Sequence, residues 1–75
     1  MPRLPVLSGQ EMVRILAKAG FEVRHQKGSH IILRKVIAPC LTVSVPNHVE
    51  IKRGLLRGLI REAGLTRDEF LALLD

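Results

Sequence analysis

The chain has 75 residues, of which 47% are apolar, and its 12 Lys and Arg against 7 Asp and Glu give a formal charge of +5. This composition excludes a disordered chain, and no apolar run approaches the roughly 20 residues of a membrane span. One cysteine excludes a disulfide framework, and two phenylalanines without Trp or Tyr exclude a reader of unpaired bases that works by aromatic stacking. A basic single domain over residues 1–75 favours a polyanion or an acidic protein as its partner.

The first helix is expected to begin after Ser8, which forms a capping box with Glu11 three residues later. Gly20 is the glycine that ends the helix. Between these signals the apolar residues recur at helical spacing, at Met12, Ile15, Leu16 and Ala19. The pattern predicts an amphipathic helix with one buried face.

Three strands are expected in the middle of the chain. Residues 21–26 and 41–45 alternate apolar and polar side chains, which predicts two half-buried strands. In the first of these, the alternation places His25 on the same face as Phe21 and Val23. Residues 31–33 are apolar throughout, as expected of a central strand. Pro46 ends the third strand.

A second long helix is expected over residues 52–63, ended by Gly64. Its inward residues are Leu55, Leu56, Leu59, Ile60 and Ala63. Thr66 and Glu69 repeat the capping box and predict a short last helix through Leu74. The order helix, three strands, helix and short helix predicts an α+β fold, a two-layer sandwich in which helices cover one face of a three-stranded antiparallel sheet.

The triplet Gly28-Ser29-His30 is the strongest candidate for a functional site. Gly28 suits a tight turn between two strands, and His30 begins the central strand. An unperturbed histidine, with a pKa of about 6.5, exchanges protons at physiological pH. Lys27 and Arg34 are cations that could hold a phosphate beside it. From these residues alone, an exposed strand histidine without catalytic function stays the alternative.

Other polar residues are candidate substrate contacts. Ser29 suits a phosphate contact or a turn-stabilising residue. His48, just before a helix N-terminus, suits a proton donor, a phosphate contact or a capping residue. Lys52 begins the second long helix, which then carries either a phosphate-binding stripe or a solvated face at Arg53, Arg57 and Arg61. Three scattered histidines and one cysteine do not make a metal site, so no metal or cofactor is expected.

Five short motifs follow one another over almost the whole chain: Leu4-Pro5-Val6-Leu7-Ser8-Gly9, Ala19-Gly20-Phe21, Gly28-Ser29-His30, Val45-Pro46-Asn47-His48, and Leu56 with Ile60-Arg61-Glu62-Ala63-Gly64-Leu65. In this order they resemble the HicA toxins, small ribonucleases of toxin–antitoxin systems. The resemblance implies a fold like that of double-stranded-RNA-binding domains, a catalytic role for His30 and a HicB antitoxin that neutralises the toxin by binding it. Leu55 stands where the family usually has threonine.

These observations predict a toxin that cleaves mRNA without a metal and is held inactive by a HicB-like antitoxin. A non-catalytic module that binds double-stranded RNA is the first alternative, and a domain whose basic face meets an acidic protein is the second. The N-terminus has no apolar signal segment, and we expect a cytoplasmic protein without membrane association.

Overall fold

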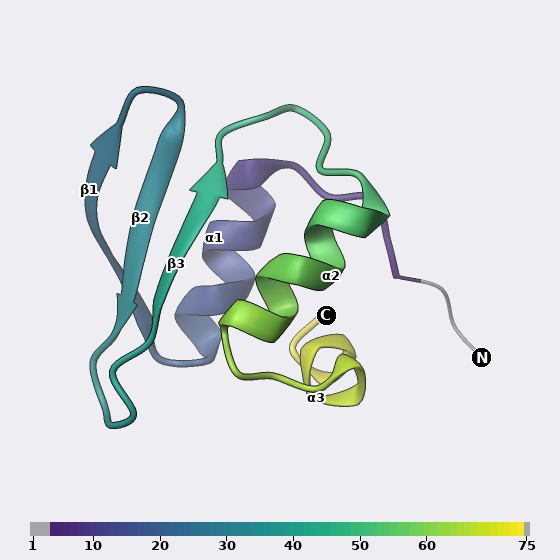
Figure 1. Ribbon diagram of the computed structural model, residues 1–75. Helices are drawn as coiled ribbons and strands as arrows, with labels where there is room; N and C mark the ends of the chain where they lie inside the picture. The colour runs from purple at the N-terminus through teal and green to yellow at the C-terminus, as the bar shows by residue number, and fades with distance from the viewer. Residues whose placement is uncertain (1–3, 75) are drawn as a thin grey trace.

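The structure is a computed structural model, and it describes residues 4–74. Within that range the chain forms three helices and three strands, which are α1 (Gly9–Lys18), β1 (Phe21–Lys27), β2 (His30–Lys35), β3 (Thr42–Pro46), α2 (Arg53–Glu62) and α3 (Arg67–Ala72) (Figure 1). The predicted order of elements is confirmed, and most predicted ends differ from these by one or two residues. No helix within residues 4–74 is long and apolar enough to cross a membrane.

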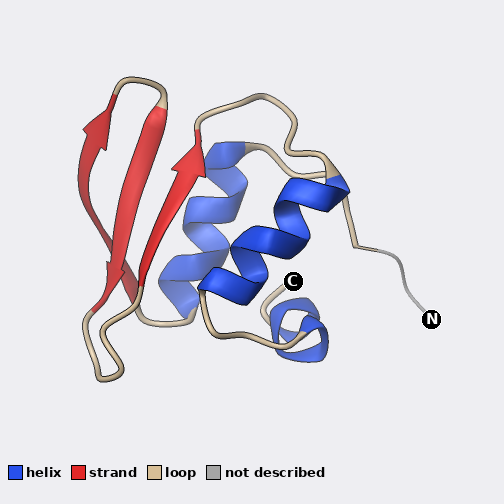
Figure 2. Cartoon of the chain, viewed as in Figure 1, coloured by secondary structure: helices blue, strands red, loops and turns tan. Residues whose placement is uncertain are grey.

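The three strands form one antiparallel sheet in the order β1-β2-β3, so β2 is central as predicted. The helices all lie on one side of the sheet (Figure 2). Between the two layers lies one apolar core, because each element turns its apolar side inward. Its fully buried large side chains are Phe70, Met12, Leu16, Leu33, Ile51, Leu56, Val43 and Val45. The two-layer α+β prediction is confirmed.

Both predicted capping boxes are present. The Ser8 hydroxyl accepts a hydrogen bond from the Glu11 backbone N–H at 3.1 Å, and the Glu11 carboxylate accepts one from the Ser8 backbone N–H at 2.9 Å. Thr66 and Glu69 form the same pair of bonds at the start of α3. Each box satisfies two backbone N–H groups that the helix itself leaves unpaired, which fixes where the helix starts.

The prediction for the first strand is wrong in one respect, because β1 contains a β-bulge. Val23 pairs with Leu33, but the next pair is His25 with Ile32, so Arg24 is an extra residue in β1. The bulge reverses the alternation, and His25 faces the side opposite to the one predicted. Val23 keeps its predicted direction but is 53% exposed, because β1 is an edge strand and only its first residue is buried.

Two other expectations about burial and length also differ from the structure. Leu55 was expected to face inward, but its side chain is 46% exposed, because the buried stripe of α2 consists of Leu56, Leu59 and Ile60. The last helix ends at Ala72 and not at Leu74. The remaining predicted inward residues of α2 are buried as expected.

Candidate functional site

The sheet has one side that no helix of residues 4–74 covers, and we call it the outer face. In β2 the side chains of Ile31 and Leu33 are buried against the helices, so those of His30 and Arg34 point the opposite way and are exposed. Residues paired across strands share a face. The register therefore assigns to the outer face Glu22, His25, Lys27, His30, Ile32, Arg34, Thr42, Ser44 and Pro46.

His30 is positioned by the hairpin between β1 and β2. Gly28 has a φ of 60°, which matches a two-residue turn with glycine in its first position. Within the described chain only glycines have a positive φ. The Gln26 side-chain amide donates to the Gly28 carbonyl at 3.1 Å. This turn makes His30 the first residue of β2, directly opposite Lys27.

The loop that carries His48 is attached to the same end of the sheet. Pro46 pairs with His30, and the Asn47 backbone N–H donates to the Ser29 carbonyl at 2.6 Å. The chain then turns toward the helices, where the His48 carbonyl accepts from the Gly9 backbone N–H at 2.8 Å. The structure thus brings Ser29, His30 and His48 to one end of the sheet.

On the outer face Arg24, Lys27 and Arg34 outnumber the acidic residue Glu22. The bulged residue Arg24 lies on this side, because its guanidinium is 3.9 Å from the Glu22 carboxylate. Arg24 also lines a cleft of about 220 Å³ together with Arg34, Lys35, Val36 and Cys40. Cys40 is an exposed free thiol in the loop between β2 and β3. A surface with a histidine among several cations favours an anionic ligand such as a phosphodiester.

A family model described as the HicA toxin of bacterial toxin-antitoxin systems matches residues 9–65 of the chain. This chain belongs to the HicA toxin family. The matched range contains the whole sheet, α1, α2 and every residue of the outer face. As a HicA toxin, the protein acts in a toxin–antitoxin system and has an antitoxin as its partner. A search of the curated proteins found no match.

The arginines of α2 lie away from the outer face of this HicA toxin. The Arg53 Nε donates to the Leu4 carbonyl at 3.1 Å in a partly buried hydrogen bond, so Arg53 attaches the N-terminal segment to α2. Arg57 and Arg61 line a cleft of about 230 Å³ among the helices, with Leu4 and Leu65. The structure therefore does not bring Arg53 or Arg57 together with His30. Lys52 is the exposed N-cap residue of α2, at the end of the loop that carries His48.

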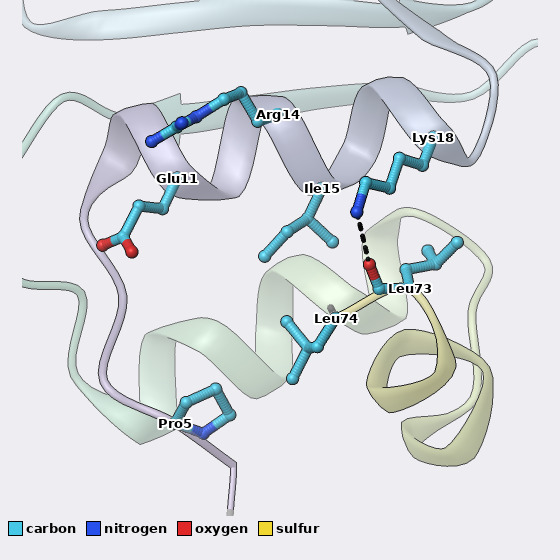
Figure 3. Close-up of a pocket in the computed structure, with 7 residues that line it drawn as sticks. All are labelled: Pro5, Glu11, Arg14, Ile15, Lys18, Leu73 and Leu74. Atoms are coloured by element: carbon cyan, nitrogen blue, oxygen red, sulfur yellow. Dashed lines mark hydrogen bonds between the residues drawn. The ribbon is translucent and has the colours of Figure 1, made fainter.

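A cleft of about 410 Å³ lies on the helical side of the toxin, where α1 meets the two ends of the described chain (Figure 3). Lys18 Nζ donates to the Leu73 carbonyl at 3.1 Å across it. Its lining consists of Pro5, Glu11, Arg14, Ile15, Lys18, Leu73 and Leu74. It contains no histidine, so the candidate chemistry of this toxin does not lie in this cleft.

One residue of the outer face was not recognised from the sequence as part of the site. His25 reaches this face only because of the bulge at Arg24, and strict alternation assigns it to the opposite face. The only sequence signal that His25 belongs to the site is its place between the cations Arg24 and Lys27. Within residues 4–74 no group of three or more His, Cys, Asp and Glu side chains is arranged to hold a metal ion.

Proposed function

We propose that this HicA toxin is an endoribonuclease that cleaves mRNA in the cytoplasm and uses His30 as a catalytic residue. The observation that carries the proposal is the position of His30. It is exposed on the uncovered face of the sheet, opposite Lys27, in a chain that belongs to a toxin family. An exposed imidazole beside a cation can approach the backbone of a nucleic acid without any rearrangement of the core.

For RNA cleavage such a site need not supply a nucleophile, because the RNA carries its own. The 2′-hydroxyl attacks the adjacent phosphate when a base removes its proton, and an acid then protonates the departing oxygen. One positioned imidazole contributes about 10²–10⁴-fold to such a proton transfer. We therefore propose a reaction that depends on His30 and needs no metal ion.

The proposed substrate contacts fall into two groups. Lys27, Ser29 and Arg34 lie on the hairpin and the central strand beside His30, and the Ser29 hydroxyl has no hydrogen bond within residues 4–74. His48 and Lys52 lie on the loop that follows β3. Arg53 and Arg57 belong to α2, so they are contacts only for an RNA that extends past this loop onto the helices.

The proposed partner is a HicB-like antitoxin that neutralises the toxin by binding it. Its binding would have to prevent RNA from reaching His30, since this face has no covering segment within the described chain. Co-purification of the toxin with its antitoxin, followed by loss of RNA cleavage in the complex, tests this part of the proposal. Cleavage at the same rate with and without bound antitoxin would contradict it.

The ribonuclease activity is tested by incubating the purified chain with RNA in the presence of EDTA, beside a His30→Ala variant. Cleavage by the wild type and a loss of at least about 10²-fold in a folded variant is the expected result. RNA binding without products in either protein would favour the non-catalytic RNA-binding module. No RNA affinity at low salt would favour a domain that meets only an acidic protein.

A further inference from the structure

We infer that His25 is a second catalytic residue, which transfers a proton at the same phosphodiester as His30. The inference rests on the proposed ribonuclease function and goes beyond it, because it assigns a partner to His30. The β-bulge at Arg24 brings His25 to the same face of the sheet as His30.

The register gives the relation between the two imidazoles. Lys27 pairs with His30, and His25 pairs with Ile32, so His25 and His30 are diagonal neighbours on adjacent strands. The backbones of diagonal neighbours lie about 7–8 Å apart, within reach of side chains that face the same way. Both histidines are exposed. A phosphate that rests on the outer face between β1 and β2 can therefore touch both rings.

The chemistry of the cleavage needs two proton transfers. The bond from the 2′-oxygen to phosphorus forms as a neutral imidazole takes the 2′-hydroxyl proton. The bond from phosphorus to the 5′-oxygen breaks as an imidazolium gives its proton to that oxygen. The products are a 2′,3′-cyclic phosphate and a 5′-hydroxyl, and no other reactant is consumed. A base and an acid that work at once are best supplied by two groups on opposite sides of the phosphate.

His48 is the other histidine that could supply the second proton transfer, and the structure favours His25 over it. The Asn47 N–H still donates to the Ser29 carbonyl beside His30, and only then does the chain leave the sheet and turn toward α1, where the His48 carbonyl accepts from the Gly9 N–H at 2.8 Å. His48 therefore belongs to a loop held by the helical layer. His25 belongs to a strand hydrogen-bonded to the strand of His30.

The charged groups around the two histidines suit a bound phosphate. Arg24 and Lys27 flank His25 on β1, with Glu22 as the acidic residue of this face, and Arg34 lies on β2. The β3 residues on this face are Thr42, Ser44 and Pro46, which carry no charge. The cations compensate the charge that develops on the phosphate oxygens, so the histidines remain available for proton transfer.

The first measurement is the single-turnover rate of cleavage of a single-stranded RNA oligonucleotide by the wild type, His25→Ala, His25→Arg and His48→Ala. His25→Arg is the matched control, because it keeps a positive charge but cannot exchange a proton near neutral pH. We expect His25→Ala and His25→Arg both to lose about 10²–10⁴-fold in rate, and His48→Ala to lose much less. Full activity of His25→Arg would show that His25 only contacts the phosphate through its charge, and would overturn the inference.

The second measurement uses the same RNA with sulfur in place of the 5′-oxygen at the cleaved bond, since a thiolate leaves without protonation. One of the two variants His25→Ala and His30→Ala, the one that lacks the acid, should regain most of its rate on this substrate, while the other should not. Recovery of both or of neither would overturn the inference. A wild-type chain that cleaves no RNA would overturn the proposed function as well, whereas a His25→Ala variant as fast as the wild type would overturn this inference alone.

Discussion

The backbone N–H of Asn47 donates to the carbonyl of Ser29 at 2.6 Å. This bond continues the pairing of β2 with β3 by one step beyond His30 and Pro46. It joins the turn that positions His30 to the loop that carries His48. Two motifs that lie far apart in the sequence therefore meet in one corner of the fold, and the His48 carbonyl joins this corner to Gly9 at the N-terminus of α1.

Gly9→Ala should destabilise this corner. A Cβ atom at Gly9 would overlap the Pro46 carbonyl oxygen and lie 2.9 Å from the Asn47 Cα, and both are backbone atoms that cannot rotate away. Such overpacking costs about 1–3 kcal/mol. Because 1 kcal/mol lowers the Tm of a domain of this size by roughly 4–8 °C, thermal unfolding should detect it. Cleavage of RNA should fall as well, because the loop beside His30 moves.

Gly58→Ala is the matched control for Gly9→Ala. A Cβ atom at Gly58 meets no atom within 4 Å, and the residue lies inside α2. Alanine in a helix interior is favoured over glycine by about 1 kcal/mol, so this variant should be more stable than the wild type. A Gly9→Ala protein that melts at or above the wild-type temperature would show that the contact between α1 and the loop is loose.

The capping box of α1 should make stability depend on pH in the acid range. The Ser8 backbone N–H, the Ser8 hydroxyl and the nearby charge of Arg14 lower the pKa of Glu11 below its ordinary value of 4.5. A carboxyl whose pKa is lower in the folded state stabilises the fold above its ordinary pKa, and this stability is lost as the pH falls through the folded pKa. Wild type should therefore lose more free energy of unfolding between pH 7 and pH 3 than Glu11→Gln.

Denaturant unfolding at a series of pH values measures this difference. Ser8→Ala serves as a comparison, because it removes the hydroxyl at a cost of about 1 kcal/mol but keeps the backbone N–H that is the largest cause of the lowered pKa. Its free energy of unfolding should keep most of the acid dependence. Curves of wild type and Glu11→Gln that run parallel down to pH 3 would show that the Glu11 carboxylate does not stabilise the helix.

The salt dependence of RNA binding should separate the cations of the outer face from those of α2. Each phosphate contact contributes about 0.7–0.9 to the slope of log affinity against log salt. Arg34 lies on the face of His30, so Arg34→Ala should reduce the slope by about 0.7–0.9, the contribution of one phosphate contact. Arg57→Ala should change it less for a short RNA, because Arg57 lines a cleft among the helices. Equal changes in both variants would mean that the RNA also covers α2.

The parts of the fold that depend on neighbours in the sequence were predictable. The capping boxes at Ser8 and Thr66 are local hydrogen-bond patterns of four residues, and both occur where the residue types indicated. The central place of β2 agreed with its continuous apolar run, in which Ile31 and Leu33 are buried and Ile32 is half-buried between its neighbours on β1 and β3.

The parts that depend on pairing between distant segments were not predictable. The bulge at Arg24 arises from the register of β1 against β2, and nothing in the residues of β1 alone reverses the alternation there. For the same reason the sequence assigned His25 to the wrong face. The bond from Arg53 to the Leu4 carbonyl likewise joins residues that no periodicity connects, so an arginine expected in a stripe with Arg57 instead attaches the N-terminal segment.

The role of His30 is tested most directly by cleavage of RNA with purified wild type and His30→Ala in the presence of EDTA. His30 is exposed and makes no side-chain hydrogen bond within residues 4–74, so its removal should leave the circular dichroism spectrum and the Tm unchanged. We expect cleavage by the wild type and a loss of at least about 10²-fold in the variant. A folded His30→Ala protein that cleaves RNA at the wild-type rate would contradict it.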